Sequence, residues 1–202
     1  MGEYIENLVP DQRVGSQMDA VESKITDTLF QAQELFSLAA ERLLDVNCWG
    51  KISGMSEFRL CDPNGNQVDR PAQKGDFIRI DIPGPGTLAG NGFDWVRVEE
   101  IKVRDDKNSN LVAMRVRPSR NPTSKHKEVA HFLKDDATST FLICRDRIWV
   151  WAEEHGRNEI PNIYSGRLID RGRNLVIGFA AKLGISYPQW KLLVKGLLNT
   201  EG

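Results

Sequence analysis

The chain has 202 residues, of which 40% are hydrophobic and 27% are charged, and its formal net charge is −1. This composition is ordinary for a globular protein and excludes the disordered, collagen-like and disulfide-rich classes. No apolar run approaches the roughly 20 residues that span a bilayer, and the acidic first residues differ from the basic start of a signal or transit peptide. We therefore expect a cytoplasmic protein without a membrane partner.

The charges are unevenly distributed along the chain. Residues 1–47 carry nine acidic and three basic side chains, whereas residues 166–202 carry six basic and two acidic ones. Either the two ends attract each other across the fold, which we favour, or they serve partners of opposite charge. The cysteines Cys48, Cys61 and Cys144 have no C-x-x-C spacing, which favours free thiols over a metal or redox site.

Residues 1–15 are predicted to form a flexible tail, and a long helix is predicted from about Ser16 to Val46. Ser16 could cap this helix, with Asp19 in the capping-box position. The apolar positions recur at mostly helical spacing: Met18, Val21, Ile25, Leu29, Ala32, Phe36, Ala39 and Leu43. This stripe predicts a helix lying on its own core, and a dimerising coiled coil is the less favoured alternative.

The centre of the chain changes to the period of two that is typical of strands. Alternation is clear around Phe58–Leu60 and Ile78–Ile82, and a change of parity at Glu99-Glu100 predicts a β-bulge. Residues 105–110 are predicted to form a hairpin loop leading into the strand 111–116. Thr140–Ala152 is expected to form two strands that turn near Arg145-Asp146-Arg147.

Helices are predicted on either side of the last of these strands. A short one is expected at about Ser124–Lys134, followed near the end of the chain by a pair. Ser165 would cap the first of the pair, which would end at Leu183, and Pro188 would begin the second, bearing Trp190, Leu193 and Leu197.

Strands flanked by segregated helices, without βαβ alternation, predict an α+β fold. We expect a mainly antiparallel, curved sheet or small barrel, with a long N-terminal helix and a two-helix C-terminal segment. Residues 16–202 would form a single domain, in which the helical pair at 163–202 could be a separate subdomain. The stretches 74–80 and 95–98 resemble the first two strands of SH3-like barrels, a resemblance that implies a curved, barrel-like sheet and no particular ligand.

The loop from Pro83 to Gly92 is rich in glycine and proline and separates two predicted strands. It leads into a strand rather than a helix, and it lacks a Gly-Lys-Ser/Thr ending, so a phosphate cradle is disfavoured. A plain connector is the simplest interpretation, and the flexible rim of a binding site is the alternative.

The densest polar cluster runs from Glu153 to Glu159 and is predicted to form a loop at the end of the strand that carries Trp149 and Trp151. His155 beside the glutamates is a candidate acid–base residue, although no nucleophile accompanies it. The competing interpretation is a solvated strand end. The candidate contacts for a ligand or partner are Trp95, Trp149, Trp151, Glu153, His155, Arg157, Asn158 and Glu159.

A basic run is the candidate nucleic-acid contact, with a solvated strand face as the favoured alternative. Its members are Arg115, Arg117, Arg120, Lys125 and Lys127. Residues 179–193 resemble a helix-turn-helix, with Gly184 at the turn, which implies DNA recognition. Only Tyr187, Gln189, Lys191, Lys195 and Asn199 remain for reading bases, so a packed helical hairpin is favoured.

Three functions remain. The favoured one is a non-catalytic module that binds a small molecule or a protein, and the alternatives are a nucleic-acid binder and a hydrolase or isomerase with His155 as the acid–base residue. The sequence predicts no metal and no cofactor, favours a non-enzyme, and leaves the ligand and the oligomeric state open.

Overall fold

The computed structural model describes residues 8–83, 87, 89–162 and 187–200. Its strands are β1 (Ser16–Ile25), β2 (Glu57–Cys61), β3 (Phe77–Asp81), β4 (Asp94–Asp105), β5 (Ser109–Pro118), β6 (Thr138–Asp146) and β7 (Trp149–Glu159). The helices are α2 (Leu29–Leu44), the 3-10 turn η1 (Val46–Cys48), α3 (Trp49–Ser53) and a C-terminal helix at 187–197.

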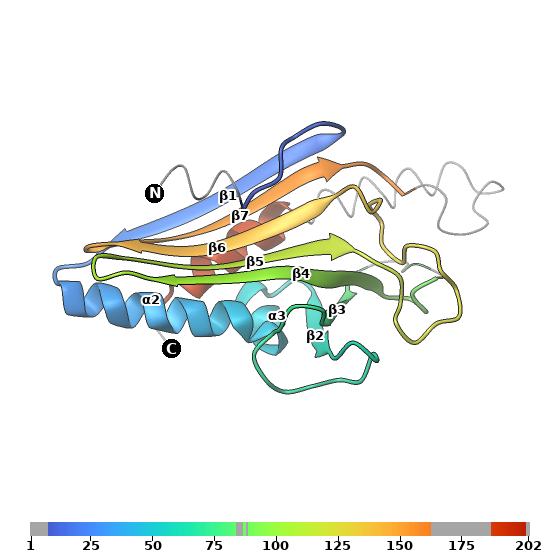
Figure 1. The fold of residues 1–202 in the computed structure, drawn as a ribbon, viewed down its shortest axis with the longest axis horizontal. Helices are drawn as coiled ribbons and strands as arrows, with labels where there is room; N and C mark the ends of the chain where they lie inside the picture. Colours follow the sequence, from blue (N-terminus) through green and yellow to red (C-terminus); the bar gives the residue numbers. More distant parts are fainter. Residues whose placement is uncertain (1–7, 84–86, 88, 163–186, 201–202) are drawn as a thin grey trace.

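The seven strands form one antiparallel sheet in the order β1-β7-β6-β5-β4-β3-β2. The α+β class and the antiparallel pairing are therefore as predicted. The small-barrel alternative, which the SH3-like resemblance supported, is wrong. A barrel requires its two outermost strands to pair, whereas β1 and β2 stand at opposite edges of an open sheet with five strands between them (Figure 1).

The predicted helix from Ser16 to Val46 is wrong in its first half, because residues 16–25 form the edge strand β1. Val21 and Ile25 suggested a helical face by their spacing of four, but that spacing also places them on one face of a strand. That face is turned to solvent, where Val21 is 55% exposed and Ile25 76%. The buried residue of β1 is Ala20, which directly precedes Val21 and packs in the core.

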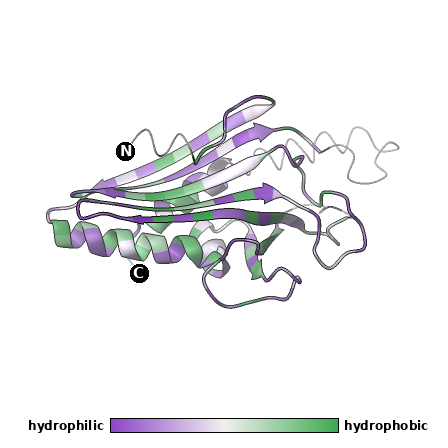
Figure 2. Cartoon of the chain, viewed as in Figure 1, coloured by the Kyte–Doolittle hydropathy of each residue, from purple (hydrophilic) through white to green (hydrophobic). Residues whose placement is uncertain are grey.

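The helix α2 begins at a capping box in which Thr28, rather than Ser16, is the N-cap. The Thr28 hydroxyl accepts the amide of Gln31, and the Gln31 side chain accepts the amide of Thr28 in return. As predicted, the helix buries one face, made of Ala32, Leu35, Phe36, Ala39 and Leu43. Figure 1 shows α2 running along one face of the long strands, and Figure 2 shows apolar and polar residues alternating along it.

The C-terminal helix packs into the same core as α2. Its buried side chains are Trp190, Leu193, Val194, Leu197 and Leu198, in agreement with the predicted last helix. Arg42 of α2 donates hydrogen bonds to the carbonyls of Gly196 and Asn199, which satisfies carbonyls at the end of the helix. Gly196 lies against α3 so closely that a Cβ there would be 2.3 Å from Cγ2 of Ile52.

The central hairpins agree with the sequence analysis. The register of β4 and β5 shifts between Val98 and Glu100, which confirms the predicted bulge, and the chain turns between Asp105 and Ser109. β6 and β7 meet at a tight turn in which Arg147 has a positive φ of 52°. The predicted two strands in 140–152 are thus confirmed.

Two further predictions are wrong. Residues 124–134 contain no helix. The Ala130 amide donates its hydrogen bond to the Ser119 carbonyl rather than to a carbonyl four residues earlier, as it would in a helix. The cluster from Glu153 to Glu159 is not a loop but the second half of β7, since it pairs with β6 on one side and β1 on the other.

Within the described ranges, no helix is long and apolar enough to cross a membrane. Cys61 and Cys144 are buried free thiols, and Cys48 is a partly exposed one. The predicted helix from Ser165 to Leu183 and most of the helix-turn-helix resemblance lie outside the described residues.

Candidate functional site

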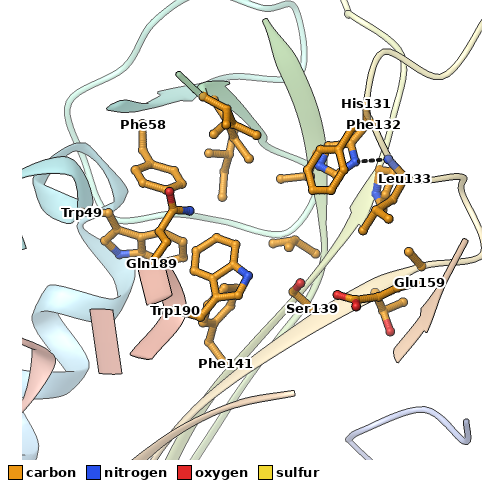
Figure 3. Close-up of a pocket in the computed structure, with 18 residues that line it drawn as sticks. Trp49, Phe58, His131, Phe132, Leu133, Ser139, Phe141, Glu159, Gln189 and Trp190 are labelled. Atoms are coloured by element: carbon orange, nitrogen blue, oxygen red, sulfur yellow. Dashed lines mark hydrogen bonds between the residues drawn. The ribbon is translucent and has the colours of Figure 1, made fainter. Parts of the chain in front are cut away.

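A pocket lies between the inner, helix-covered face of the sheet and the C-terminal helix (Figure 3). Its cavity has a volume of about 40 Å³. Strands β2 to β7 supply its floor, and Trp49, Trp190 and the segment 131–133 supply its walls. This cavity is smaller than typical small-molecule sites, which measure roughly 300–1,000 Å³, so a ligand of that size would enter only if the pocket walls moved apart.

Aromatic rings form one side of the pocket. Trp190 packs edge-on against Phe141, with ring centroids 5.2 Å apart, and Phe141 in turn lies 4.9 Å from Trp49. Phe58 completes the group at 5.5 Å from Trp49. The Trp49 indole N–H donates to carbonyls of α2, so its ring is held in place. These contacts give the pocket a preformed aromatic wall.

Aliphatic residues form the opposite floor, and few polar groups interrupt them. The aliphatic lining is Ile78, Ile80, Ile82, Val96 and Val116. The polar lining includes His131, whose Nδ1 accepts the Leu133 amide at 3.0 Å, and Gln189, whose Oε1 accepts the Ser56 hydroxyl. Because its Nδ1 is an acceptor, a neutral His131 carries its proton on Nε2.

Glu159 is the charged group of the pocket lining, and a bulge in β7 directs it there. The pairing of β1 with β7 shifts next to Asn158, which has a positive φ of 57°. Asn158 is fixed in this conformation by its Oδ1, which accepts the amides of Arg13 and Val14, and by its Nδ2, which donates to the Asp11 carbonyl. The described part of residues 1–15 is thus bonded to β7.

Gly156 leaves room for the Glu159 carboxylate on the inner face. A Cβ at position 156 would lie 2.7 Å from Oε1 of Glu159, so no larger residue fits without moving the carboxylate. Oε2 accepts the Ser16 hydroxyl at 3.2 Å. Burial raises the pKa of Glu159, which the Ser16 hydrogen bond and the charge of Arg157 only partly oppose.

Glu154 is a second acid on the same face of β7, and it is fully buried. It stands opposite Phe141 of β6. Burial raises its pKa well above the usual value, and the charge of Glu159 raises it further. The nearby Ser139 side chain lowers the pKa of Glu154, which opposes part of this rise. Neither carboxyl oxygen of Glu154 has a well-formed hydrogen bond in the described part of the chain. The inner face therefore carries two poorly compensated acids.

His155 projects from the outer face of the sheet, not into this pocket. Its Nδ1 contacts Asp19 at 2.5 Å and its Nε2 contacts Glu153 at 2.7 Å, and Arg157 pairs with Asp19 at 2.7 Å. Burial alone would lower the pKa of His155, but the hydrogen bonds to Glu153 and Asp19 raise it. The ring of His155 is thus enclosed in an ion-pair network with two carboxylates, away from the pocket.

The three candidate tryptophans lie in different environments. Trp149 and Trp151 stack on the outer face with ring centroids 4.4 Å apart, and Trp149 is 45% exposed. Trp95 is buried beside the glycine loop, where its indole N–H donates to the Gly90 carbonyl. None of the three lines the pocket, so of the candidate contacts only Glu159 does.

The basic run divides into a paired part and an exposed part. Arg115 bonds to Glu99 and Glu100, and Arg117 bonds to Glu99. These pairs, whose acidic partners come from the neighbouring strand β4, support the solvated-face interpretation. The remaining members, Arg120, Lys125 and Lys127, are exposed.

The sequence analysis missed most of the pocket. Trp49, Phe58 and Phe141 read as ordinary core residues, because nothing local distinguishes an aromatic that lines a cavity from one that fills it. Glu154 did carry a usable signal. It shares the parity of Val150 and Ala152, so strand alternation places it on the buried face.

Comparisons with known proteins leave the family open. No protein-family model and no curated protein matches the chain. The hypothetical protein jhp0584 from Helicobacter pylori has 13% identity and a TM-score of 0.44, with 90% of this chain and 84% of that one covered. Protein Ms6760 from Mycobacterium smegmatis has 13% identity and a TM-score of 0.37, covering 92% and 96%. Major latex-like protein 151 from Panax ginseng has 9% identity and a TM-score of 0.33, covering 86% and 99%. Similarities this low carry no functional argument.

Proposed function

We propose that this protein is a non-catalytic binding protein for a small, largely apolar molecule held between the sheet and the C-terminal helix. The observation that carries this proposal is the apolar pocket, whose aromatic wall and aliphatic floor surround a cavity of about 40 Å³ that would widen if the C-terminal helix moved outward. An apolar cavity normally costs stability, because its lining loses contacts that a filled core would make. A ligand that fills the space would restore those contacts.

The proposal can be tested with N-phenyl-1-naphthylamine, a neutral dye that fluoresces in apolar surroundings. We expect saturable binding of one dye per chain, with energy transfer from Trp190 and Trp49. The Ser139→Phe substitution places a ring in the pocket and should reduce the affinity at least tenfold. The matched control is Ser23→Phe, at an exposed position on the outer face of β1, which should leave binding unchanged.

Two results would overturn the proposal. One is the absence of saturable dye binding to the wild-type protein, and the other is equal affinity for the two phenylalanine variants. If Ser139→Phe fails to fold, Trp190→Phe replaces it. That variant should still bind dye but show weaker energy transfer, and unchanged transfer would mean that the dye binds elsewhere.

A nucleic-acid binder remains the second candidate, supported by the exposed residues Arg120, Lys125 and Lys127. Binding by these residues would weaken steeply with added salt. The ion pairs of Arg115 and Arg117 reduce the positive charge that the run can offer, which is why we rank this candidate second.

A further inference from the structure

We propose that the ligand of this pocket is a hydrophobic amine, bound as its ammonium ion, whose positive charge pairs with the Glu159 carboxylate. This inference rests on the proposed function and specifies the chemical class of the ligand. It follows from the charge balance of the inner face and from the way β7 is built around Glu159.

The described residues of the pocket lining give its acid, Glu159, no lysine or arginine partner. Glu159 is only 9% exposed, Glu154 is 0% exposed, and the described residues that line the pocket include no lysine and no arginine. A buried carboxylate is costly unless a positive group or several hydrogen-bond donors compensate it. Among the described residues, Glu159 has one hydrogen-bond donor, the Ser16 hydroxyl.

Arg157 is the nearest described cation, but its donors are committed elsewhere. Its Nη2 contacts Asp19 at 2.7 Å on the outer face, and its Nη1 donates to the carbonyls of Met18 and Gly156. The guanidinium therefore ties β1 to β7, and its charge reaches Glu159 only from a distance. Since no described residue pairs directly with Glu159, we assign the compensating charge to the ligand.

The placement of Glu159 is structurally enforced. The bulge at Asn158 and the missing side chain at Gly156 together bring the carboxylate to the inner face. Figure 3 shows it next to Ser139, on the side of the pocket away from Trp49 and Phe58. A ligand that spans the pocket would thus meet a carboxylate at one end and aromatic rings at the other.

The aromatic wall suits the same ligand class. The faces of Trp and Phe rings carry partial negative charge and attract ammonium groups, most strongly where water is excluded. Their bodies accept the hydrocarbon part of an amine equally well. An anionic ligand such as a fatty acid would instead face Glu159 with no lysine or arginine in the described lining, which disfavours it.

Glu159, rather than Glu154, is the acid assigned to the pairing. Two neighbouring buried acids do not both ionise readily, and Glu154 is the more deeply buried of the two. The ammonium would favour the ionised form of Glu159, so binding should release a proton wherever the free acid is still protonated. Affinity for the amine should then rise with pH through the raised pKa of Glu159.

The test compares three probes of nearly equal shape: 1-naphthylmethylamine, 1-naphthylmethanol and 1-naphthoate. Each is titrated against the dye-loaded wild-type protein at neutral pH, and displacement of N-phenyl-1-naphthylamine is measured. We expect the amine to bind at least tenfold more tightly than the alcohol, and the carboxylate to bind most weakly. Glu159→Gln keeps the size of the side chain and should reduce the preference for the amine over the alcohol to within about threefold.

The matched control is Glu153→Gln on the outer face of the same strand, which should keep the full preference for the amine. The inference falls if the alcohol binds the wild-type protein as tightly as the amine, or if Glu159→Gln retains the preference. In both cases the proposed function survives, because a neutral probe still binds. If none of the probes nor the dye binds, the proposed function itself has failed.

Discussion

Neighbouring residues of β7 show two opposite ways of burying charge. On the outer face, His155 lies between Asp19 and Glu153, and Arg157 joins Asp19, so every member of the group has a partner of opposite charge. On the inner face, Glu154 has no well-formed hydrogen bond among the described residues, and Glu159 has only the Ser16 hydroxyl. One strand thus carries a compensated cluster and an uncompensated one, back to back.

Whether buried charges are paired distinguishes a structural cluster from a candidate binding site more clearly than the types of residue do. A histidine between carboxylates suggests catalysis in a sequence, yet here its partners fix the edge strand β1 to β7. Two glutamates in a charged run suggest a solvated surface, yet Glu154 and Glu159 are both buried on the inner face, and Glu159 lines the pocket. Charge that the fold leaves unpaired is the better indicator of a binding site, because the fold alone gives it no stabilising partner.

The largest effect is expected from Glu154→Met, which removes the uncompensated acid and keeps its approximate volume. We expect the free energy of unfolding to rise by about 1–3 kcal/mol at neutral pH, the cost of an unsatisfied buried polar group. Because burial raises the pKa of Glu154, the wild-type protein should lose stability as the pH rises above about 4.3, the unfolded value. Urea unfolding at several pH values measures both effects.

The Met variant should lack that decline, so its advantage over the wild type should grow with pH. A Met variant that is less stable than the wild type throughout this range would show that Glu154 is compensated after all, and the contrast between the two faces would not hold.

A smaller effect is expected from His155→Ala on the compensated face. We expect a loss of about 1–2 kcal/mol near pH 6, since charge-assisted hydrogen bonds are lost. Hydrogen bonds from His155 and Arg157 outweigh burial and lower the pKa of Asp19, while those to Glu153 and Asp19 outweigh burial and raise that of His155. The cluster should therefore stabilise most between the pKa of Asp19 and that of His155.

Its stabilisation should be lost as the pH falls through the lowered pKa of Asp19, and again as the pH rises through the raised pKa of His155. A double-mutant cycle with Asp19→Asn isolates the pairing energy. A coupling energy near zero, or a catalytic activity abolished by His155→Ala, would contradict the purely structural role.

The smallest effect is expected from Glu99→Gln, which removes the shared partner of Arg115 and Arg117 on partly exposed β4. Such surface pairs contribute roughly 0–1 kcal/mol. The free energy of unfolding, measured by thermal unfolding, should therefore fall by no more than this amount. If the basic run binds nucleic acid, the variant should bind more tightly at low salt, because a competing negative charge is gone. If neither the wild-type protein nor the variant binds nucleic acid, the basic run is a solvated face.

The sequence predicted the local features well and the long-range ones poorly. The bulge at Val98–Glu100 and the turn at Arg147 follow from parity and composition within a few residues, and both are present. β1 was mistaken for helix because Val21 and Ile25 are apolar but exposed, and only the pairing with β7 decides the matter. The pocket depends on contacts such as that of Phe141 with Trp190, which lie too far apart in sequence for any periodicity to show.

The close contact between Gly196 and Ile52 means that a residue outside the pocket sets the position of one pocket wall. Trp190 and Gly196 are on the same rigid helix, about 9 Å apart along its axis, and the absence of a side chain at 196 lets that helix settle fully onto α3. A larger residue there would lift the helix, and with it the indole of the pocket wall. Related proteins could thus widen or narrow their choice of ligand through a position that no ligand touches.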